Sequence, residues 1–319
     1  MFIEPDGCSG CMLCVIRCPI NAIFLSNGVA CKREYAQLEG YEQYVREVEV
    51  NLEEKLTLTE KALSLLSELC APPLYNQDVK DILDNFEAKT SVTQLGWAQD
   101  QYYVWVRNCL RELGLDALYT GSAGKLKRAD VTLRAPFYAG IEVKSPAEGE
   151  INVGAIRQAL DAAREVRDAY GADIAYRAVI GSGIARGAHR RAISWYNNDG
   201  VKIPLIRGRY LLYLTLKHQS HLPQLPQVDM RRILTEYVGW FGKDELQQYF
   251  KAYFGTRRNE ITSGTVTLPL PPVVTDYLAA GNSHDALKEL ERLENETAGE
   301  IERCFPDPER KARGGYATD

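Results

Sequence analysis

The sequence contains no apolar run that approaches the roughly 18 residues needed to cross a bilayer. Its first residues also lack the basic flank and uninterrupted apolar stretch of a signal peptide, because Asp6 and four cysteines stand there. No unit is repeated along the 319 residues. These absences argue against a membrane protein and a secreted protein, so we expect a cytoplasmic chain of two or three domains with no membrane partner.

The cysteines are unevenly distributed. Four of the eight fall within the first 18 residues, while Cys31, Cys70, Cys109 and Cys304 are scattered over the rest. A disulfide framework is one interpretation, but a clustered set without a secretion signal favours metal binding. Among the scattered cysteines, we expect Cys70 and Cys109 to be core residues. Cys304 lies near the polar end of the chain, where we expect no role.

The clustered cysteines have the spacing C-x2-C-x2-C-x3-C, followed at once by Pro19. Residues 1 to about 30 therefore resemble the segment of bacterial ferredoxins that binds a [4Fe–4S] cluster. Zinc is the alternative, although zinc loops more often contain two separated C-x2-C pairs. The resemblance implies an iron–sulfur cluster held by a set of four cysteines: Cys8, Cys11, Cys14 and Cys18.

The fourth ligand stays open. In two-cluster ferredoxins the fourth cysteine of the run binds the other cluster, and this sequence has no second run. Cys18 is the favoured fourth ligand, with Cys31 or Cys70 as alternatives. A three-iron cluster held by the first three cysteines is a further alternative.

Charge is also unevenly distributed. The chain has a formal net charge of −5, but residues 177–217 hold eight Lys and Arg against one acid, Asp199, a local charge of +7. Such a segment favours contact with a polyanion, and a solvated basic face is the competing interpretation. The eight cations are Arg177, Arg186, Arg190, Arg191, Lys202, Arg207, Arg209 and Lys217.

Four regions differ in pattern: residues 1–35 with the cysteines, a helical acidic stretch in 36–93, an alternating helix and strand pattern in 94–220, and a mostly helical region in 221–319. The third region predicts a mixed α/β core with a central sheet. We expect helices at 93–113, 153–171 and 185–197. We expect strands at 115–121, 129–135, 139–145, 175–181 and 211–217. Further helices are expected at 229–241, 244–254 and 284–304, with an extended piece at 266–274.

A second candidate site lies in the predicted strands 129–135 and 139–145. Alternation along a strand places Glu142 and Lys144 on one face, and a hairpin would bring Asp130 beside Glu142. Two carboxylates with the carbonyl of Val143 form a hard oxygen site suited to Mg²⁺. Lys144 could then orient or help deprotonate an attacking water, which is the chemistry of phosphodiester hydrolysis.

The residues Asp130, Glu142, Val143 and Lys144 resemble the D…ExK core of the PD-(D/E)XK nuclease superfamily, which includes type II restriction enzymes. The resemblance covers about residues 94–217 and implies a restriction-endonuclease-like mixed-sheet core flanked by helices. It also implies a catalytic role for Gln158 on the helix that follows. Many members carry a further Glu on the preceding helix, where this chain offers Gln99, Asp100, Gln101 and, nearer the helix end, Glu112.

Basic side chains near this core predict a DNA-binding surface. One group is the turn of Lys125, Lys127 and Arg128. A second group lies on the predicted helix 185–197, where the helix N-terminus also favours phosphate. It comprises Arg186, His189, Arg190 and Arg191.

The sequence therefore predicts a Mg²⁺-dependent endodeoxyribonuclease of restriction or defence type with a structural [4Fe–4S] cluster. A double-strand cut made by one active site would require a homodimer. The alternative is an iron–sulfur redox sensor or electron-transfer protein whose α/β domain only binds DNA.

Overall fold

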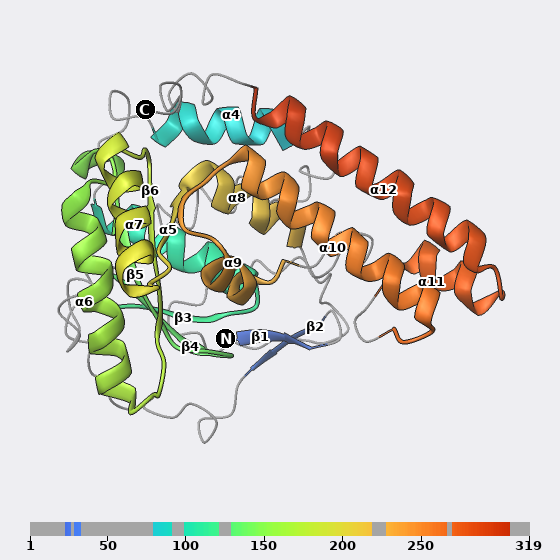
Figure 1. Cartoon of the computed structure of the whole chain (residues 1–319), viewed down its shortest axis with the longest axis horizontal. Coiled ribbons are helices and arrows are strands. Elements are labelled where there is room, and N and C mark those ends of the chain that lie inside the picture. The colour runs from blue at the N-terminus through green and yellow to red at the C-terminus, as the bar shows by residue number, and fades with distance from the viewer. Residues whose placement is uncertain are drawn as a thin grey trace.

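A computed structural model describes residues 23–26, 29–32, 79–90, 99–120, 129–218, 228–266 and 270–306. Its centre is a six-stranded sheet in the order β3-β4-β5-β6-β7-β8, with helices against both faces (Figure 1). The strands are β3 (Asp116–Tyr119), β4 (Val131–Ala135), β5 (Ala139–Lys144), β6 (Tyr176–Gly181), β7 (Pro204–Arg207) and β8 (Gly239–Phe241). The described part is therefore an α/β fold, as the sequence predicts.

The sheet is mixed. β3, β4 and β5 pair antiparallel, whereas β5 to β8 run parallel to one another. β5 is the strand where the pattern changes, and its first five residues are buried. An apolar strand that is covered on both faces is typical of the parallel part of such sheets.

One face of the sheet is covered by α6 (Val153–Tyr170) and α7 (Arg186–Asp199), the crossover helices between the parallel strands. Asn152 caps α6 by accepting from the N–H of Ala155, and Gly171 ends it in the left-handed region. A stripe of small residues lets α6 approach the sheet closely. It comprises Ala155, Ala159, Ala162 and Ala163.

The other face is covered by α5 (Gln99–Glu112) and α8 (Gly208–His218), with α4 (Val79–Thr90) beyond them. Trp105 of α5 is fully buried and stacks on Phe86 of α4 with ring centroids 4.5 Å apart. The aromatic contact joins α4, from the region before the predicted core, to the main hydrophobic cluster.

The predicted strand at 211–217 is wrong, because these residues belong to helix α8. Every residue from Tyr210 to Lys217 is buried. A helix buried all round shows the same unbroken apolar run as a buried strand, so periodicity does not separate the two. The last parallel strand of the predicted core lies just before it, in β7.

The predicted helix at 229–241 also needs correction. Only its first part is helical, as α9 (Met230–Glu236), and its last three residues form β8. The helix ends at Tyr237, whose backbone is extended, and the φ of +71° at Gly239 allows the backbone to turn into the sheet. The sheet thus continues past residue 220, where we predict the core to end.

The remaining helices are α10 (Lys243–Ser263), α11 (Pro272–Ala279) and α12 (Ser283–Cys304). α10 and α12 lie side by side and extend away from the sheet (Figure 1). Ion pairs join them, including Lys243 with Glu302 at 2.5 Å. Part of the predicted extended piece at 266–274 is helical, since Pro272 starts α11. Cys304 is buried at the end of α12, in agreement with the predicted helix at 284–304.

Candidate functional site

Asp130 and Glu142 meet at the antiparallel pair β4 and β5. The register aligns Val131 with Ile141, so Asp130, one residue before β4, comes opposite Glu142. The N–H of Val143 donates to Oδ2 of Asp130 over 2.8 Å. The predicted proximity of these two carboxyl groups is confirmed.

Lys144 completes the group. Its Nζ lies 2.9 Å from Oε1 of Glu142, and both side chains are nearly enclosed, with 12% and 4% of their surface exposed. The same Nζ lies 3.4 Å from Oε1 of Glu148. Lys144 thus bridges two carboxylates, one of which we had not assigned from the sequence.

Burial dominates the electrostatics of the two acids. It raises the pKa of Asp130, an effect that the N–H of Val143 partly offsets. Burial and the adjacent charge of Asp130 raise the pKa of Glu142 as well. Burial alone would lower the pKa of Lys144, but the contacts with Glu142 and Glu148 outweigh it and raise this pKa. Raised pKa values favour the protonated forms of both acids, so the pair holds less negative charge than two free carboxylates would.

Glu148 is fixed by a capping box at the start of the 3-10 helix η4 (Pro146–Glu148). Its Oε2 accepts from the N–H and the hydroxyl of Ser145, both at 2.9 Å, and from the hydroxyl of Tyr103, also at 2.9 Å. The sequence signal was present, because Ser145-Pro146-x-Glu148 is the S-x-x-E pattern with proline at the first position. Tyr103 comes from α5 and has no comparable signal.

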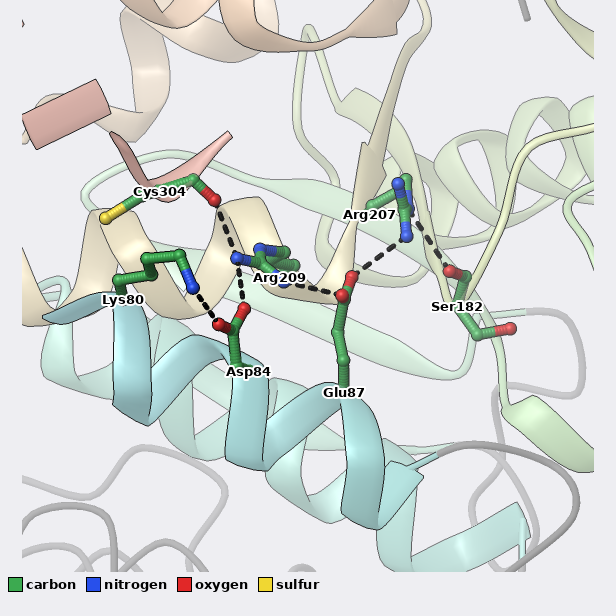
Figure 2. Close-up of polar contacts among 7 residues, drawn as sticks. All are labelled: Lys80, Asp84, Glu87, Ser182, Arg207, Arg209 and Cys304. Carbon is green, nitrogen blue, oxygen red and sulfur yellow. Dashed lines mark hydrogen bonds and ion pairs between the residues drawn. The ribbon is translucent and has the colours of Figure 1, made fainter. Parts of the chain in front are cut away.

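The group lies at the carboxyl end of the parallel strands, where open α/β sheets bind their ligands. The N–H of Ser182, just after β6, donates to the carbonyl of Lys144 over 3.3 Å. Arg207, at the end of β7, donates to the carbonyl of Ser182 over 3.3 Å. The ends of β5, β6 and β7 are therefore joined in one row, and Figure 2 shows the last of these contacts.

Acids neutralise part of the predicted basic segment, and Figure 2 shows those that come from α4. Arg207 lies 2.9 Å from Glu87, and Arg209 bonds to Asp84, to Glu87 and to the carbonyl of Cys304 at 2.5–2.7 Å. Another cation of the segment, Lys217, lies 2.5 Å from Glu300. These three cations serve internal packing, so the local charge of +7 overstates the charge available to a polyanion.

The predicted DNA-binding residues of α7 differ in exposure. Arg186 and Arg190 are exposed, whereas Arg191 is half-buried with its guanidinium 5.1 Å from the ring centroid of Trp195. Nδ1 of His189 accepts from the N–H of Trp240 over 3.0 Å. His189 therefore holds α7 to β8 through that nitrogen, and its role as a phosphate donor stays a prediction.

Gln158 is exposed on α6, next to the buried Ala159. No contact recorded in the described ranges joins it to Asp130 or Glu142, and its catalytic role stays a prediction. Glu112 is buried at the end of α5, where burial raises its pKa to about 8. Burial alone accounts for that shift, with no contribution from the acidic pair.

The donor chemistry of the site suits a hard cation. Within the described residues, His, Cys, Asp and Glu form no group of three or more that could hold a metal ion. The predicted ligand set is smaller than that, because it consists of Asp130, Glu142 and the carbonyl of Val143. Mg²⁺ fits such a sparse oxygen set, since it retains several waters.

Other predicted site residues lie outside the described residues. They are the ligands Cys8, Cys11, Cys14 and Cys18, the alternative Cys70, and the basic turn of Lys125, Lys127 and Arg128. Cys31 is described as part of β2 (Val29–Lys32), opposite Phe24 of β1 (Ile23–Ser26) in an antiparallel pair.

Residues 1–24 match the family model of the 4Fe-4S binding domain, which supports an iron–sulfur cluster at the cysteine run. The match covers a small part of the 319 residues and does not include any residue of the α/β fold. No curated protein and no solved structure matches the chain. None of the helices in the described ranges has the length and apolar character needed to cross a membrane.

Proposed function

We propose that the protein is a Mg²⁺-dependent endodeoxyribonuclease of the PD-(D/E)XK type that carries a structural [4Fe–4S] cluster. One observation carries the proposal. Asp130, Glu142 and Lys144 converge at the point where an antiparallel pair of strands gives way to a parallel sheet. This is the arrangement that the resemblance to the nuclease core implies.

Each residue of the group has a role in this proposal. Asp130, Glu142 and the carbonyl of Val143 would hold Mg²⁺, which when bound activates water and offsets charge on a phosphodiester. Lys144 would supply a positive charge next to the scissile phosphate. Burial keeps bulk water from screening these charges, which strengthens their effect on a bound phosphate.

DNA would approach along the carboxyl ends of β5, β6 and β7. Arg186 and Arg190 are exposed on α7, which begins at this end of the sheet after β6. Contacts of such residues with phosphates position a duplex without reading its sequence. In this proposal the cluster of the cysteine segment stabilises the chain and does not carry electrons.

The test is cleavage of supercoiled and linear duplex DNA by anaerobically purified full-length protein with Mg²⁺. Asp130→Asn and Lys144→Ala should lower the rate at least about a hundredfold, as loss of a charge-stabilising group does. Asp168→Asn is a matched control, because Asp168 is an exposed acid on α6 that pairs with Arg167. Full activity in both site variants would contradict the proposal.

Sequencing of the cut ends would give the position of cleavage and any recognition sequence. Measuring cleavage with the cluster reduced and oxidised separates the proposal from a redox sensor. A rate that follows the redox state, with unchanged thermal stability, would favour the sensor.

A further inference from the structure

Lys144 has two anionic partners at different distances, Oε1 of Glu142 at 2.9 Å and Oε1 of Glu148 at 3.4 Å. If Glu142 binds a divalent cation, the cation and the ammonium compete for the same carboxylate. An ammonium group with only 12% of its side chain exposed is costly to leave without a partner. Glu148 therefore affects how strongly Glu142 can bind a cation, because it offers the ammonium group of Lys144 another partner.

Glu148 is a fixed partner. The hydrogen bonds from Ser145 and Tyr103 all fall on its Oε2, so Oε1 faces Lys144. Because Ser145 directly follows Lys144 and Tyr103 belongs to α5, the carboxylate is anchored from two elements. Its position does not depend on the contact with Lys144.

We propose that Glu148 is a positioning residue that takes over Lys144 when Glu142 binds a divalent cation. This change of partner moves the ammonium group of Lys144 away from Glu142, the ligand of the cation. The ammonium group stays next to the reacting phosphate. The inference rests on the proposed function, because it assumes that Glu142 is a cation ligand. It assigns a role to Glu148 that neither the D…ExK pattern nor the 4Fe-4S match contains.

The experiment measures Mg²⁺ binding to the full-length protein by calorimetry, without DNA. Glu148→Gln should weaken Mg²⁺ binding about fivefold, because Lys144 then stays on Glu142. With Lys144→Met present, the same change should alter Mg²⁺ binding less than about twofold, since no ammonium competes. The difference between the two backgrounds is the energy of coupling between Glu148 and Lys144.

Two further variants separate position from charge and from folding. Glu148→Asp keeps the charge but shortens the reach, so it should weaken Mg²⁺ binding as Glu148→Gln does. Ser145→Ala removes one hydrogen bond to Oε2 and keeps the contact with Lys144, so the change should be less than about twofold. Urea denaturation of each variant confirms that it folds.

The outcomes are distinct. If Glu148→Gln weakens Mg²⁺ binding equally with and without Lys144→Met, the charge of Glu148 acts on the cation directly. That result would overturn the proposed change of partner. No weakening in either background overturns it as well. Absence of Mg²⁺ binding by the unaltered protein would refute the metal site of the proposed function itself.

Discussion

Gly140 of β5 lies against the backbone of Ala162 in α6. A Cβ at position 140 would come within 2.5 Å of the carbonyl carbon of Ala162 and 2.7 Å of its oxygen. No flexible side chain is available there to move aside. The helix and the strand that carries Glu142 and Lys144 are therefore in backbone contact, and only glycine fits.

We expect Gly140→Ala to destabilise the protein by about 3 kcal/mol, because α6 must shift to admit the methyl group. Urea denaturation gives the change in the free energy of unfolding. Gly299→Ala in α12 is the matched control, since its Cβ would meet nothing within 4 Å. It should stabilise the protein by up to about 1 kcal/mol through helix propensity. Equal effects at the two positions would contradict the close packing.

Glu112 should make stability depend on pH. Burial raises its pKa from the ordinary value of 4.5 to about 8 in the folded chain. The folded state then binds more protons than the unfolded state in this window, so the free energy of unfolding falls as pH rises from about 4.5 to about 8. The total fall due to this group is at most about 5 kcal/mol.

Glu112→Gln removes the ionisable group and should flatten this fall, measured by urea denaturation at several pH values in the window. Glu291→Gln changes an exposed acid of α12 and should leave the pH dependence as it is. If the free energy of unfolding of Glu112→Gln falls with pH as steeply as that of the unaltered protein, Glu112 is not the cause of the fall.

Arg209 ties three helices together through Asp84, Glu87 and the carbonyl of Cys304. Its side chain is only 10% exposed, whereas the two acids of α4 are about 40% exposed. We expect Arg209→Ala to lower the free energy of unfolding by about 2 kcal/mol. This lies between the cost of breaking an exposed ion pair and the cost of breaking a buried one. Arg292→Ala breaks exposed pairs within α12 and should leave the free energy of unfolding nearly unchanged.

Cys11→Ser should reduce the iron content and the brown absorbance of the purified protein, because serine is a poor ligand for an iron–sulfur cluster. Cys11 belongs to the segment that matches the 4Fe-4S binding domain. If the cluster is structural, thermal stability falls together with DNA cleavage. Cys109→Ser leaves the cysteine run intact and should retain the iron. Retention of full iron by Cys11→Ser would contradict the ligand assignment.

The sequence was sufficient for features that depend on local pattern. Strand alternation predicted that Glu142 and Lys144 share a face, and Gly171 and Gly200 mark the ends of α6 and α7 as helix-ending glycines do. The pairing of Asp130 with Glu142 followed from the short connection between the two strands. These features depend on neighbours within about a dozen residues.

Features set by distant residues were missed. The apolar run of α8 is a helix because α4 and α5 pack against it and the sheet lies beneath, which the run itself does not encode. The partners of Arg207 and Arg209 lie on α4, more than a hundred residues earlier. The contact of Tyr103 with Glu148 likewise depends on how α5 crosses the sheet.

The internal ion pairs of the basic segment bear on how salt would affect DNA binding. A cation that is already paired with an acid displaces no counterions from DNA, so Arg207, Arg209 and Lys217 contribute nothing to the salt dependence. At most five of the eight cations in residues 177–217 remain for phosphate contacts. For this segment, the slope of log affinity against log salt concentration should be no steeper than about −4.5, whereas eight available cations would give about −7.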